Sequence, residues 1–342
     1  MSRLTKKSIL HTTNHKATIK TYKHALKLKK GNIHVGSHTS IVPSILTGLQ
    51  YIKEIGGNSA QIFLGSNSSA SLKLKTKLTP TDITEIKKYV KQNKVQLIVH
   101  SIYLLNFAFY PPFSGRNKYA HENLQHDLKY AALLGAKCVV LHFGFRSKKM
   151  PSGEKVTLDL QTSLNIMATN VNYILSKAPK NIRLALETSA GYGSQVGSSL
   201  SDIKYVWDKI YDKYKKKQIG ICIDTAHIFV SGYDISNVNG MRDYLEEFDK
   251  LIGIKYITNL HINDSRYELG SKHDEHRGLQ HGKIFSTGEG LEALKYLIKF
   301  CTTHKIPMIL ETHGAAAKDK APSKNSPDST YTEEIQLIKS LV

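Results

Sequence analysis

The stretch ICIDTAH, residues 221–227, passes from a short apolar run directly into two side chains that commonly bind metal ions, Asp224 and His227. Five other apolar runs end on a residue of the same kind: VQLIVHS at His100, VVLHF at His142, LALET at Glu187, NLHIN at His261 and MILET at Glu311. Each run is strand-like, and the strands of a closed parallel barrel all end on one face. The sequence therefore predicts a multi-metal site at the mouth of a barrel.

Strand and helix signals alternate along the rest of the chain. Strands are expected at residues 33–35, 60–64, 96–100, 138–143, 183–187, 220–224, 258–262 and 307–311. They are short and apolar on both faces, as in a buried parallel sheet. Helical patterns are expected at residues 43–55, 80–93, 120–134, 158–176, 200–214, 241–251 and 290–304. This alternation predicts an α/β (β/α)8 TIM barrel, because a doubly wound sheet would place ligands only around one switch point.

Charge is distributed unevenly along the chain. The formal net charge of +20 points to a polyanionic partner, nucleic acid first, although a generally lysine-rich proteome would also give it. Residues 1–30 carry eight lysines and Arg3 but no acidic residue, which predicts a disordered basic tail. Residues 31–313 are expected to form the barrel domain. Residues 314–342 are expected to form a linker and a short C-terminal helix that begins at Tyr331.

The cysteines and the apolar runs bear on the compartment. Cys138, Cys222 and Cys301 lie far apart without a CxxC pair, which disfavours a thiolate zinc site and favours a reducing compartment. No apolar run approaches the ~20 residues of a membrane span, and residues 1–30 lack the apolar core of a secretory signal. We therefore expect a soluble intracellular protein without a membrane partner, in the nucleus, the cytoplasm or a virus particle.

Three local groups of ligand-type residues strengthen the metal prediction, and one of them, His261 with Asn263 and Asp264, stands at a strand end. Asp224 and His227 lie three residues apart, just past an expected strand. Asp274 and His276 lie two residues apart, so in an extended segment both side chains point to the same side and can bind one ion. Each pair alone is a weak signal. Together with the strand ends, they make an accidental pattern hard to accept.

Several longer segments resemble the endonuclease IV family of zinc-dependent abasic-site endonucleases, also named AP endonuclease family 2. They are VHSIYLLN, LHFG, ALETSAGYGSQVG, CIDTAHIFVSGYD, LHINDS followed by GSKHDEH, and ILET. The resemblance extends from about Ile33 to about His313. It implies a TIM barrel with a trinuclear zinc site at the carboxyl ends of the strands.

The resemblance implies nine zinc ligands. They are His100, His142, Glu187, Asp224, His227, His261, Asp274, His276 and Glu311. The first zinc would be bound by His100, His142 and Glu187. Glu187 would bridge to a second zinc, which Asp224, His261 and Glu311 complete. The third would take His227, Asp274 and His276. Imidazole and carboxylate ligands alone suit zinc or manganese; the resemblance favours three zinc ions per chain. It also gives catalytic roles to Glu187 and Glu311, the latter by orienting the attacking water.

The implied activity is hydrolysis of the phosphodiester 5′ to abasic sites in double-stranded DNA, which leaves a 3′-OH and a 5′-deoxyribose phosphate. Removal of blocked 3′ ends is implied as well, and we expect a monomer. One alternative is a sugar-isomerase-like two-metal barrel, which explains neither the charge nor His227 and the Asp274–His276 pair. Another is a non-catalytic DNA-binding barrel, which would not need nine intact ligand positions.

Residues around the ligands are expected to contact DNA. Tyr103 and Leu104 resemble the residues that the family inserts beside an abasic nucleotide; the alternative for HSIYLLN is ordinary barrel packing. His38 resembles a family position near the DNA. Asp264 is expected to orient His261, and Asn263 is expected to be structural.

The chain departs from the family in two loops. Residues 65–69 read GSNSS where the family has Lys-Asn-Gln-Arg, so we expect no arginine wedge there, although Lys73 and Lys75 follow. Near the third ligand set, Arg266 stands for a lysine, Glu275 for an arginine and Gln280 for a glycine. The loss of positive charge at Glu275 is expected to weaken phosphate contacts.

Overall fold

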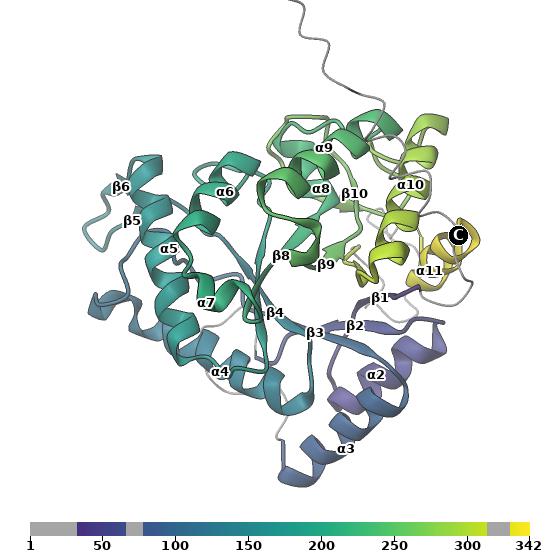
Figure 1. Cartoon of the computed structure of the whole chain (residues 1–342), viewed down its shortest axis with the longest axis horizontal. Helices are drawn as coiled ribbons and strands as arrows, with labels where there is room; N and C mark the ends of the chain where they lie inside the picture. The colour runs from purple at the N-terminus through teal and green to yellow at the C-terminus, as the bar shows by residue number, and fades with distance from the viewer. Residues whose placement is uncertain (1–32, 66–77, 313–328) are drawn as a thin grey trace, which may run out of the picture.

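The computed structural model describes residues 33–65, 78–312 and 329–342, and its centre is a closed barrel of parallel strands (Figure 1). The strands follow one another around the barrel in the order β1-β12-β9-β8-β7-β4-β3-β2. Their bounds are Val35–His38 (β1), Ser59–Ile62 (β2), Gln96–His100 (β3), Cys138–His142 (β4), Arg183–Glu187 (β7), Ile219–Asp224 (β8), Ile257–His261 (β9) and Met308–Leu310 (β12). The predicted TIM barrel is confirmed.

Helices surround the barrel and cover the outer face of its strands (Figure 1). They are α2 (Ile45–Glu54), α3 (Pro80–Gln92), α4 (Lys118–Leu134), α5 (Leu160–Lys177), α6 (Leu200–Lys209), α7 (Asp212–Lys215), α8 (Thr225–Ser231), α9 (Val238–Leu251), α10 (Gly288–His304) and α11 (Tyr331–Ser340). Local sequence fixes the start of α3, where Thr79 Oγ1 accepts from the backbone N–H of Asp82 while the Asp82 carboxylate accepts from that of Thr79. Such a capping residue stabilises a helix by about 1 kcal/mol.

Alternation along the strands decides which side chains enter the barrel. Ile98, Cys138, Val140, Ala185, Cys222 and Ile309 form a buried cluster of their own, separate from the larger core between strands and helices. Side chains two residues apart on a strand share a face. His100 therefore points into the barrel as Ile98 does, and Asp224 points inward as Cys222 does. The ligand-type residues are therefore the next layer of the barrel interior, at its mouth.

The structure adds elements that the pattern did not predict. Two short hairpins, β5 (Ser147–Lys149) with β6 (Lys155–Thr157) and β10 (Asp264–Ser265) with β11 (His276–Arg277), extend from the strand ends. The single helix expected at residues 200–214 is wrong, because the chain breaks between α6 and α7. Asn172 of α5 donates to the carbonyl of Lys209 and accepts from the N–H of Tyr211, so tertiary hydrogen bonds replace a helical turn.

Some predictions fall outside the described residues. They concern the basic tail at residues 1–30, Ser66–Ser69 of the altered loop with Lys73 and Lys75, and most of the linker after residue 314. Helix α11 lies where a C-terminal helix was expected and packs against β1. Among the helices of the described ranges, none combines the length and apolar character needed to cross a membrane.

Candidate metal centre

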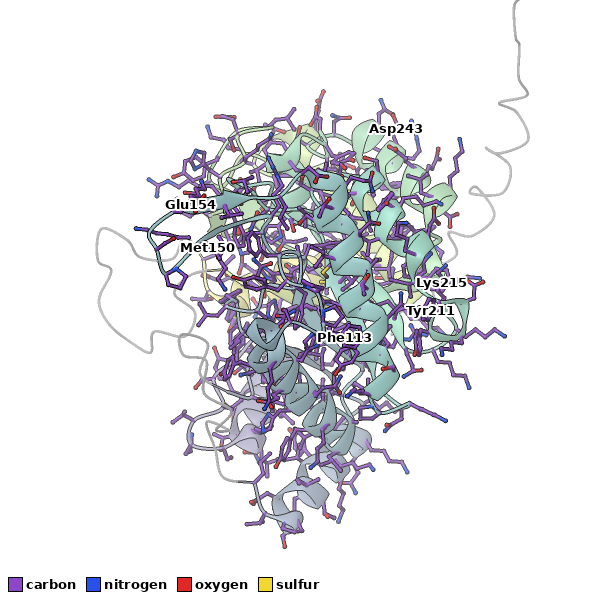
Figure 2. The ribbon with its side chains drawn as sticks, turned by 90° about the vertical axis from the view of Figure 1, so that its left-hand side faces the viewer. Phe113, Met150, Glu154, Tyr211, Lys215 and Asp243 are labelled. Carbon is purple, nitrogen blue, oxygen red and sulfur yellow. The ribbon has the colours of Figure 1, made fainter. Side chains whose placement is uncertain are left out.

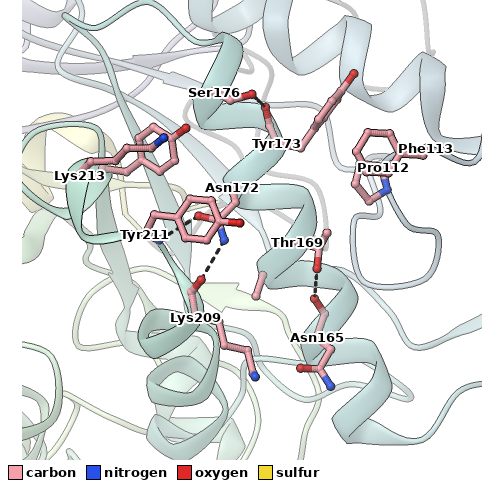
Figure 3. Close-up of a pocket in the computed structure, with 12 residues that line it drawn as sticks. Pro112, Phe113, Asn165, Thr169, Asn172, Tyr173, Ser176, Lys209, Tyr211 and Lys213 are labelled. Carbon is pink, nitrogen blue, oxygen red and sulfur yellow. Dashed lines mark hydrogen bonds between the residues drawn. The ribbon is translucent and has the colours of Figure 1, made fainter.

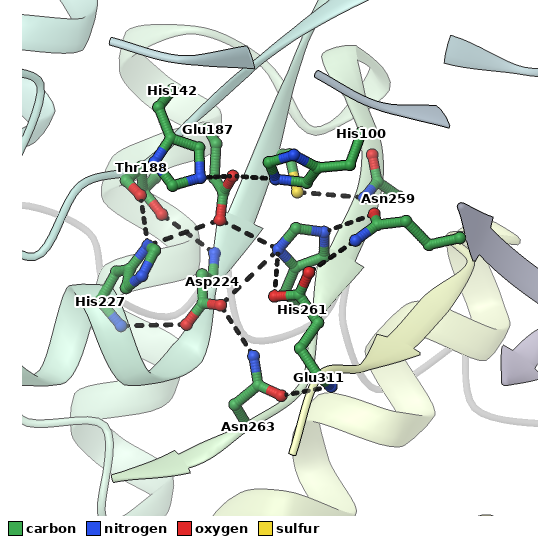
Figure 4. A network of polar contacts seen from close by, with 12 residues as sticks. His100, His142, Glu187, Thr188, Asp224, His227, Asn259, His261, Asn263 and Glu311 are labelled. Atoms are coloured by element: carbon green, nitrogen blue, oxygen red, sulfur yellow. Dashed lines mark hydrogen bonds and ion pairs between the residues drawn. The ribbon is translucent and has the colours of Figure 1, made fainter. Parts of the chain in front are cut away.

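The nine predicted ligand residues converge at the mouth of the barrel, where the strands have their carboxyl ends. Figure 4 labels His100, His142, Glu187, Asp224, His227, His261 and Glu311 of this set. Three groups bring ligand atoms within 4.8 Å of one another: His100, His142 and Glu187; Glu187, Asp224, His261 and Glu311; and Asp224, His227 and His276. Asp274 adjoins the last group, with Oδ2 3.0 Å from Nε2 of His227. Glu187 and Asp224 each belong to two groups, so the three groups form one connected centre.

In the first group, two imidazoles face one carboxylate oxygen. Nε2 of His100 lies 3.1 Å and Nε2 of His142 3.0 Å from Oε2 of Glu187. Nδ1 of His100 lies 2.7 Å from the carbonyl oxygen of Ser101, to which it can only donate. In the neutral ring, the free lone pair is then on Nε2, which faces the centre.

In the second group, Glu187 offers its other oxygen. Nδ1 of His261 lies 3.0 Å from Oε1 of Glu187, 3.0 Å from Oε2 of Glu311 and 3.6 Å from Oδ2 of Asp224. One carboxylate thus reaches both groups, an arrangement that can bridge two ions. All four side chains come from adjacent strands of the barrel or the residue directly after one.

The third group lies partly in loops beyond the strands. Nδ1 of His227 faces the carbonyl of Thr188 at 2.7 Å, which leaves Nε2 pointing at Asp274. Nε2 of His276 is buried and makes no hydrogen bond within the described residues, yet it lies 3.3 Å from Asp274 and 3.6 Å from Asp224. A buried nitrogen aimed between two carboxylates without a hydrogen bond fits a site for a cation.

The electrostatics of the centre also fit cations. Burial favours the neutral form of Glu187, but the nearby imidazoles of His142 and His261 outweigh it and hold the pKa of this carboxyl well below its usual range. Burial lowers the pKa of His276, but Asp224 and Asp274 raise it more, to about 9. Four carboxylates packed together are stabilised by positive charge, which protons on the neighbouring imidazoles can supply. Metal ions can replace those protons.

Two buried side chains link the predicted ligand residues: Gln61, which sequence analysis missed, and Asn263, which it expected to be structural. Gln61 of β2 donates from Nε2 to Glu311 at 2.5 Å, and its Oε1 lies 2.8 Å from Nε2 of His261. Asn263 donates to Asp224 at 2.8 Å and accepts from the backbone N–H of Glu311 at 2.9 Å. Both side chains are fully buried. Gln61 could have been found by its position, since a polar residue inside an apolar strand needs a partner.

The expectation that Asp264 orients His261 is wrong. The carboxylate of Asp264 accepts instead from the backbone N–H groups of Ser265, Ile284 and Phe285, at 2.8, 2.8 and 3.2 Å. It therefore fixes the chain that follows the third group. Gln61 occupies the place beside His261 that was assigned to Asp264.

The expected DNA-contacting residues lie at the rim. The ring of Tyr103 packs 5.3–5.4 Å from the rings of His100 and His142, measured between centroids, and about half of the residue is exposed. Leu104 is 59% exposed. His38, at the end of β1, lies 3.3 Å from Nε2 of Gln61 and therefore borders the second group.

The departures near the third group have structural consequences. Glu275 forms an ion pair with Arg266 at 2.6 Å, so the two side chains neutralise each other's charge at this rim. Gln280 has a φ of 70°, in the left-handed region that glycine adopts without strain. The loop thus keeps a glycine-like conformation at Gln280 despite the side chain.

The C-terminal helix contacts the segments that carry two of the predicted ligand residues. The buried carboxylate of Glu334 accepts from the backbone N–H of Leu279 at 2.7 Å and from Oγ1 of Thr312 at 2.9 Å. Leu279 lies three residues after His276, and Thr312 directly follows Glu311. Glu334 therefore ties together two ligand-bearing segments from outside the barrel.

A groove of about 480 Å³ lies on the outer wall of the barrel, away from the ligand groups (Figure 3). It runs beside α5 and the α6–α7 break. Its asparagines are already engaged, because Asn172 holds the break and Asn165 accepts from the hydroxyl of Tyr205. The groove is therefore a seam between helices and not an extension of the metal centre.

Comparisons with known proteins agree with this fold. The sequence profile described as xylose isomerase-like TIM barrel matches residues 49–341. A protein of Acanthamoeba polyphaga mimivirus named as an endonuclease 4 is 32% identical over 90% of this chain and 92% of its own. Endonuclease IV from Thermus thermophilus has the same fold, with a TM-score of 0.67 at 22% identity over 90% of this chain and 98% of its own.

A D-tagatose 3-epimerase-like protein also shares the fold, with a TM-score of 0.63 at 18% identity, covering 90% of this chain and 97% of its own. At that identity the likeness concerns the architecture alone. The mimivirus relative is more similar in sequence and matches nearly its whole length. The chain therefore belongs to the endonuclease IV family, within the xylose isomerase-like TIM barrels.

Proposed function

We propose that this protein is a DNA-repair endonuclease that hydrolyses the phosphodiester 5′ to abasic sites in double-stranded DNA. The observation that carries the proposal is the connected centre of three ligand groups that share Glu187 and Asp224. In the reaction, water adds to phosphorus, the bond to the 3′ oxygen of the preceding nucleotide breaks, and that oxygen takes a proton. The products are a 3′-OH and a 5′-deoxyribose phosphate.

We assign one zinc ion to each ligand group. His100 and His142 would hold the first with Glu187, and Asp224, His261 and Glu311 would complete the second. His227, Asp274 and His276 would hold the third. When bound, such ions supply Lewis acidity toward phosphate oxygens and lower the pKa of a water to roughly 7. The same chemistry supports removal of blocked 3′ ends, because those are also phosphate esters of a 3′ oxygen.

The protein side chains position the reactants. Glu311 is held by Gln61 and by Asn263, so its carboxylate has a fixed orientation from which it can accept a hydrogen bond from the attacking water. Tyr103 and Leu104 project at the rim, where they can fill the gap at an abasic nucleotide. Extrusion of such a nucleotide costs least because it pairs with nothing. The net charge of +20 favours a DNA partner, and we propose that the protein acts as a monomer.

Incision of a duplex with one abasic site tests the proposal. The purified protein should cut the abasic strand once, stop after treatment with a chelator, and resume when zinc is returned. Elemental analysis should give three zinc ions per chain. Isomerisation of a sugar without DNA incision would favour the isomerase alternative. DNA binding with three bound ions and no incision would favour the non-catalytic barrel.

A further inference from the structure

The β5–β6 hairpin has two chemically different faces. Its antiparallel register pairs Ser147 with Thr157, Lys148 with Val156 and Lys149 with Lys155. Residues directly opposite each other share a face, and Oγ of Ser147 indeed lies 2.8 Å from Oγ1 of Thr157. One face therefore carries two lysines and two hydroxyls, and we name it the hydroxyl–lysine face.

The opposite face packs toward the body of the protein. The ammonium of Lys148 lies 4.6 Å from the centroid of the Tyr110 ring although the residue is exposed, and Val156 is half-buried. Lys149, Lys155 and Thr157 are all exposed. Ser147 is half-buried, so the hydroxyl–lysine face is open to solvent at three of its four residues.

Two facing lysines need an explanation. Like charges directly opposite each other on an antiparallel pair are destabilising. Neither Lys149 nor Lys155 has an ion-pair partner within the described residues, and the single acidic residue between Arg146 and Thr157 is Glu154. An anion that lies between the two ammonium groups would relieve their repulsion.

The hairpin stands at the same end of the barrel as the metal centre. It follows β4, which ends at His142, and its base is joined to the loop after β7 through the Phe145–Gln195 bridge and the Arg146 N–H to Ser194 carbonyl bond of 2.9 Å. In Figure 2, Met150 and Glu154 of the hairpin lie at the edge opposite Tyr211 and Lys215, which precede β8 at the far end of the barrel.

We propose that the hydroxyl–lysine face binds phosphate groups of duplex DNA beside the incision site. Lysine and hydroxyl groups are typical partners of phosphate oxygens, and such contacts position a duplex without reading its sequence. The proposal rests on the proposed function for its choice of duplex DNA. Its role is to lengthen the stretch of DNA that the protein holds, and not to take part in the chemistry.

The test compares two double variants that lose the same charge. K149Q/K155Q alters the hairpin, and K216Q/K217Q alters exposed lysines just before β8. The dissociation constant for an undamaged and for an abasic duplex is measured across salt concentrations. For K149Q/K155Q, the slope of log affinity against log salt should fall by about 2, and affinity at 0.15 M salt should fall about ten-fold for both duplexes. K216Q/K217Q should keep the wild-type slope.

Single variants refine the result. K149Q and K155Q should each lower the slope by about 1, and K149R/K155R, which keeps both charges, should have the wild-type slope. Equal slopes for the two double variants would overturn the proposal. So would a K149Q/K155Q protein whose binding to vesicles of anionic lipid falls while its binding to DNA is unchanged. Because the undamaged duplex is bound and not cut, a slope change without any incision of abasic DNA would support the hairpin site and reject the proposed function.

Discussion

Oε1 of Gln61 lies 2.8 Å from Nε2 of His261. An amide oxygen only accepts, so a neutral His261 carries its proton on Nε2. Its Nδ1 lone pair then faces Glu187 and Glu311, each 3.0 Å away. The other end of the amide donates to Glu311. One uncharged side chain thus fixes both the tautomer of an imidazole and the orientation of a carboxylate in the second group.

Replacement of Gln61 by leucine should weaken zinc binding. The variant keeps most of the volume but removes both hydrogen bonds, and loss of such supporting partners typically costs about 10–100-fold in metal affinity or activity. Zinc retention against a competing chelator measures the effect. Gln96→Leu, at the opposite end of the barrel strands, is the matched control. Equal zinc retention in Q61L and wild type would show that His261 is oriented without Gln61.

Glu187→Gln should disable incision while DNA affinity stays within a few-fold of wild type. Glu187 faces His100 and His142 with one oxygen and His261 with the other, and it is 1% exposed, so DNA does not reach it. Loss of a metal contributing several kcal/mol to the transition state corresponds to a rate reduction on the order of 10³-fold.

The Glu187 measurement is a single-turnover incision assay with a zinc count on the same sample. Glu311→Gln should likewise lose incision, and Glu289→Gln, an exposed acid on α10, should change neither quantity. An active Glu311→Gln enzyme would refute the role given to that carboxylate.

The barrel and the convergence of the ligand-type residues could be predicted because both follow from one simple rule. Side chains alternate along a strand, so an apolar residue such as Ala185 inside the barrel places Glu187 two positions later at the mouth. The partners of the ligands obey no such rule. Gln61 lies 200 positions from His261 in the chain, and only closure of the barrel brings the two together.

Features that depend on tertiary contacts also escaped the sequence pattern. The break after α6 follows from two hydrogen bonds of Asn172, and residues 200–214 alone show a continuous helical pattern. Asp264 stands beside ligands in the chain but serves the backbone of Ile284 and Phe285 instead. Proximity in sequence to a ligand is thus a weaker guide to its support than the hydrogen-bond capacity of buried side chains.

Glu334→Gln should change how stability depends on pH. Burial raises the pKa of Glu334 to about 7, although its hydrogen bonds to Leu279 and Thr312 oppose the shift. Because the unfolded chain releases this proton near the ordinary pKa of 4.5, wild-type stability falls between about pH 4.5 and pH 7 at up to ~1.4 kcal/mol per pH unit from this group. Below the lower value and above the higher one, its contribution is constant.

The difference in free energy of unfolding between wild type and E334Q isolates that contribution. Urea unfolding at pH 5 and pH 8 should show that the free energy of unfolding of E334Q, relative to that of wild type, is higher at pH 8 than at pH 5. Gln can still accept from the N–H of Leu279, whereas Glu334→Ala removes both hydrogen bonds and should also reduce zinc retention. A difference that does not vary with pH would mean that Glu334 ionises normally in the folded protein.

Tyr103→Ala should lower affinity for abasic DNA about ten-fold and leave affinity for an undamaged duplex unchanged, since stacking of one aromatic ring is worth about 1–3 kcal/mol. The ring rests against the imidazoles of His100 and His142, which hold it in place at the rim with about half of the residue exposed. Competition binding with the two duplexes measures the difference. Tyr103→Phe keeps the ring and should behave as wild type, and a zinc count on Y103A separates lost stacking from a disturbed first group. If Y103A binds both duplexes as wild type does, Tyr103 is part of the packing around the ligands and does not contact the abasic nucleotide.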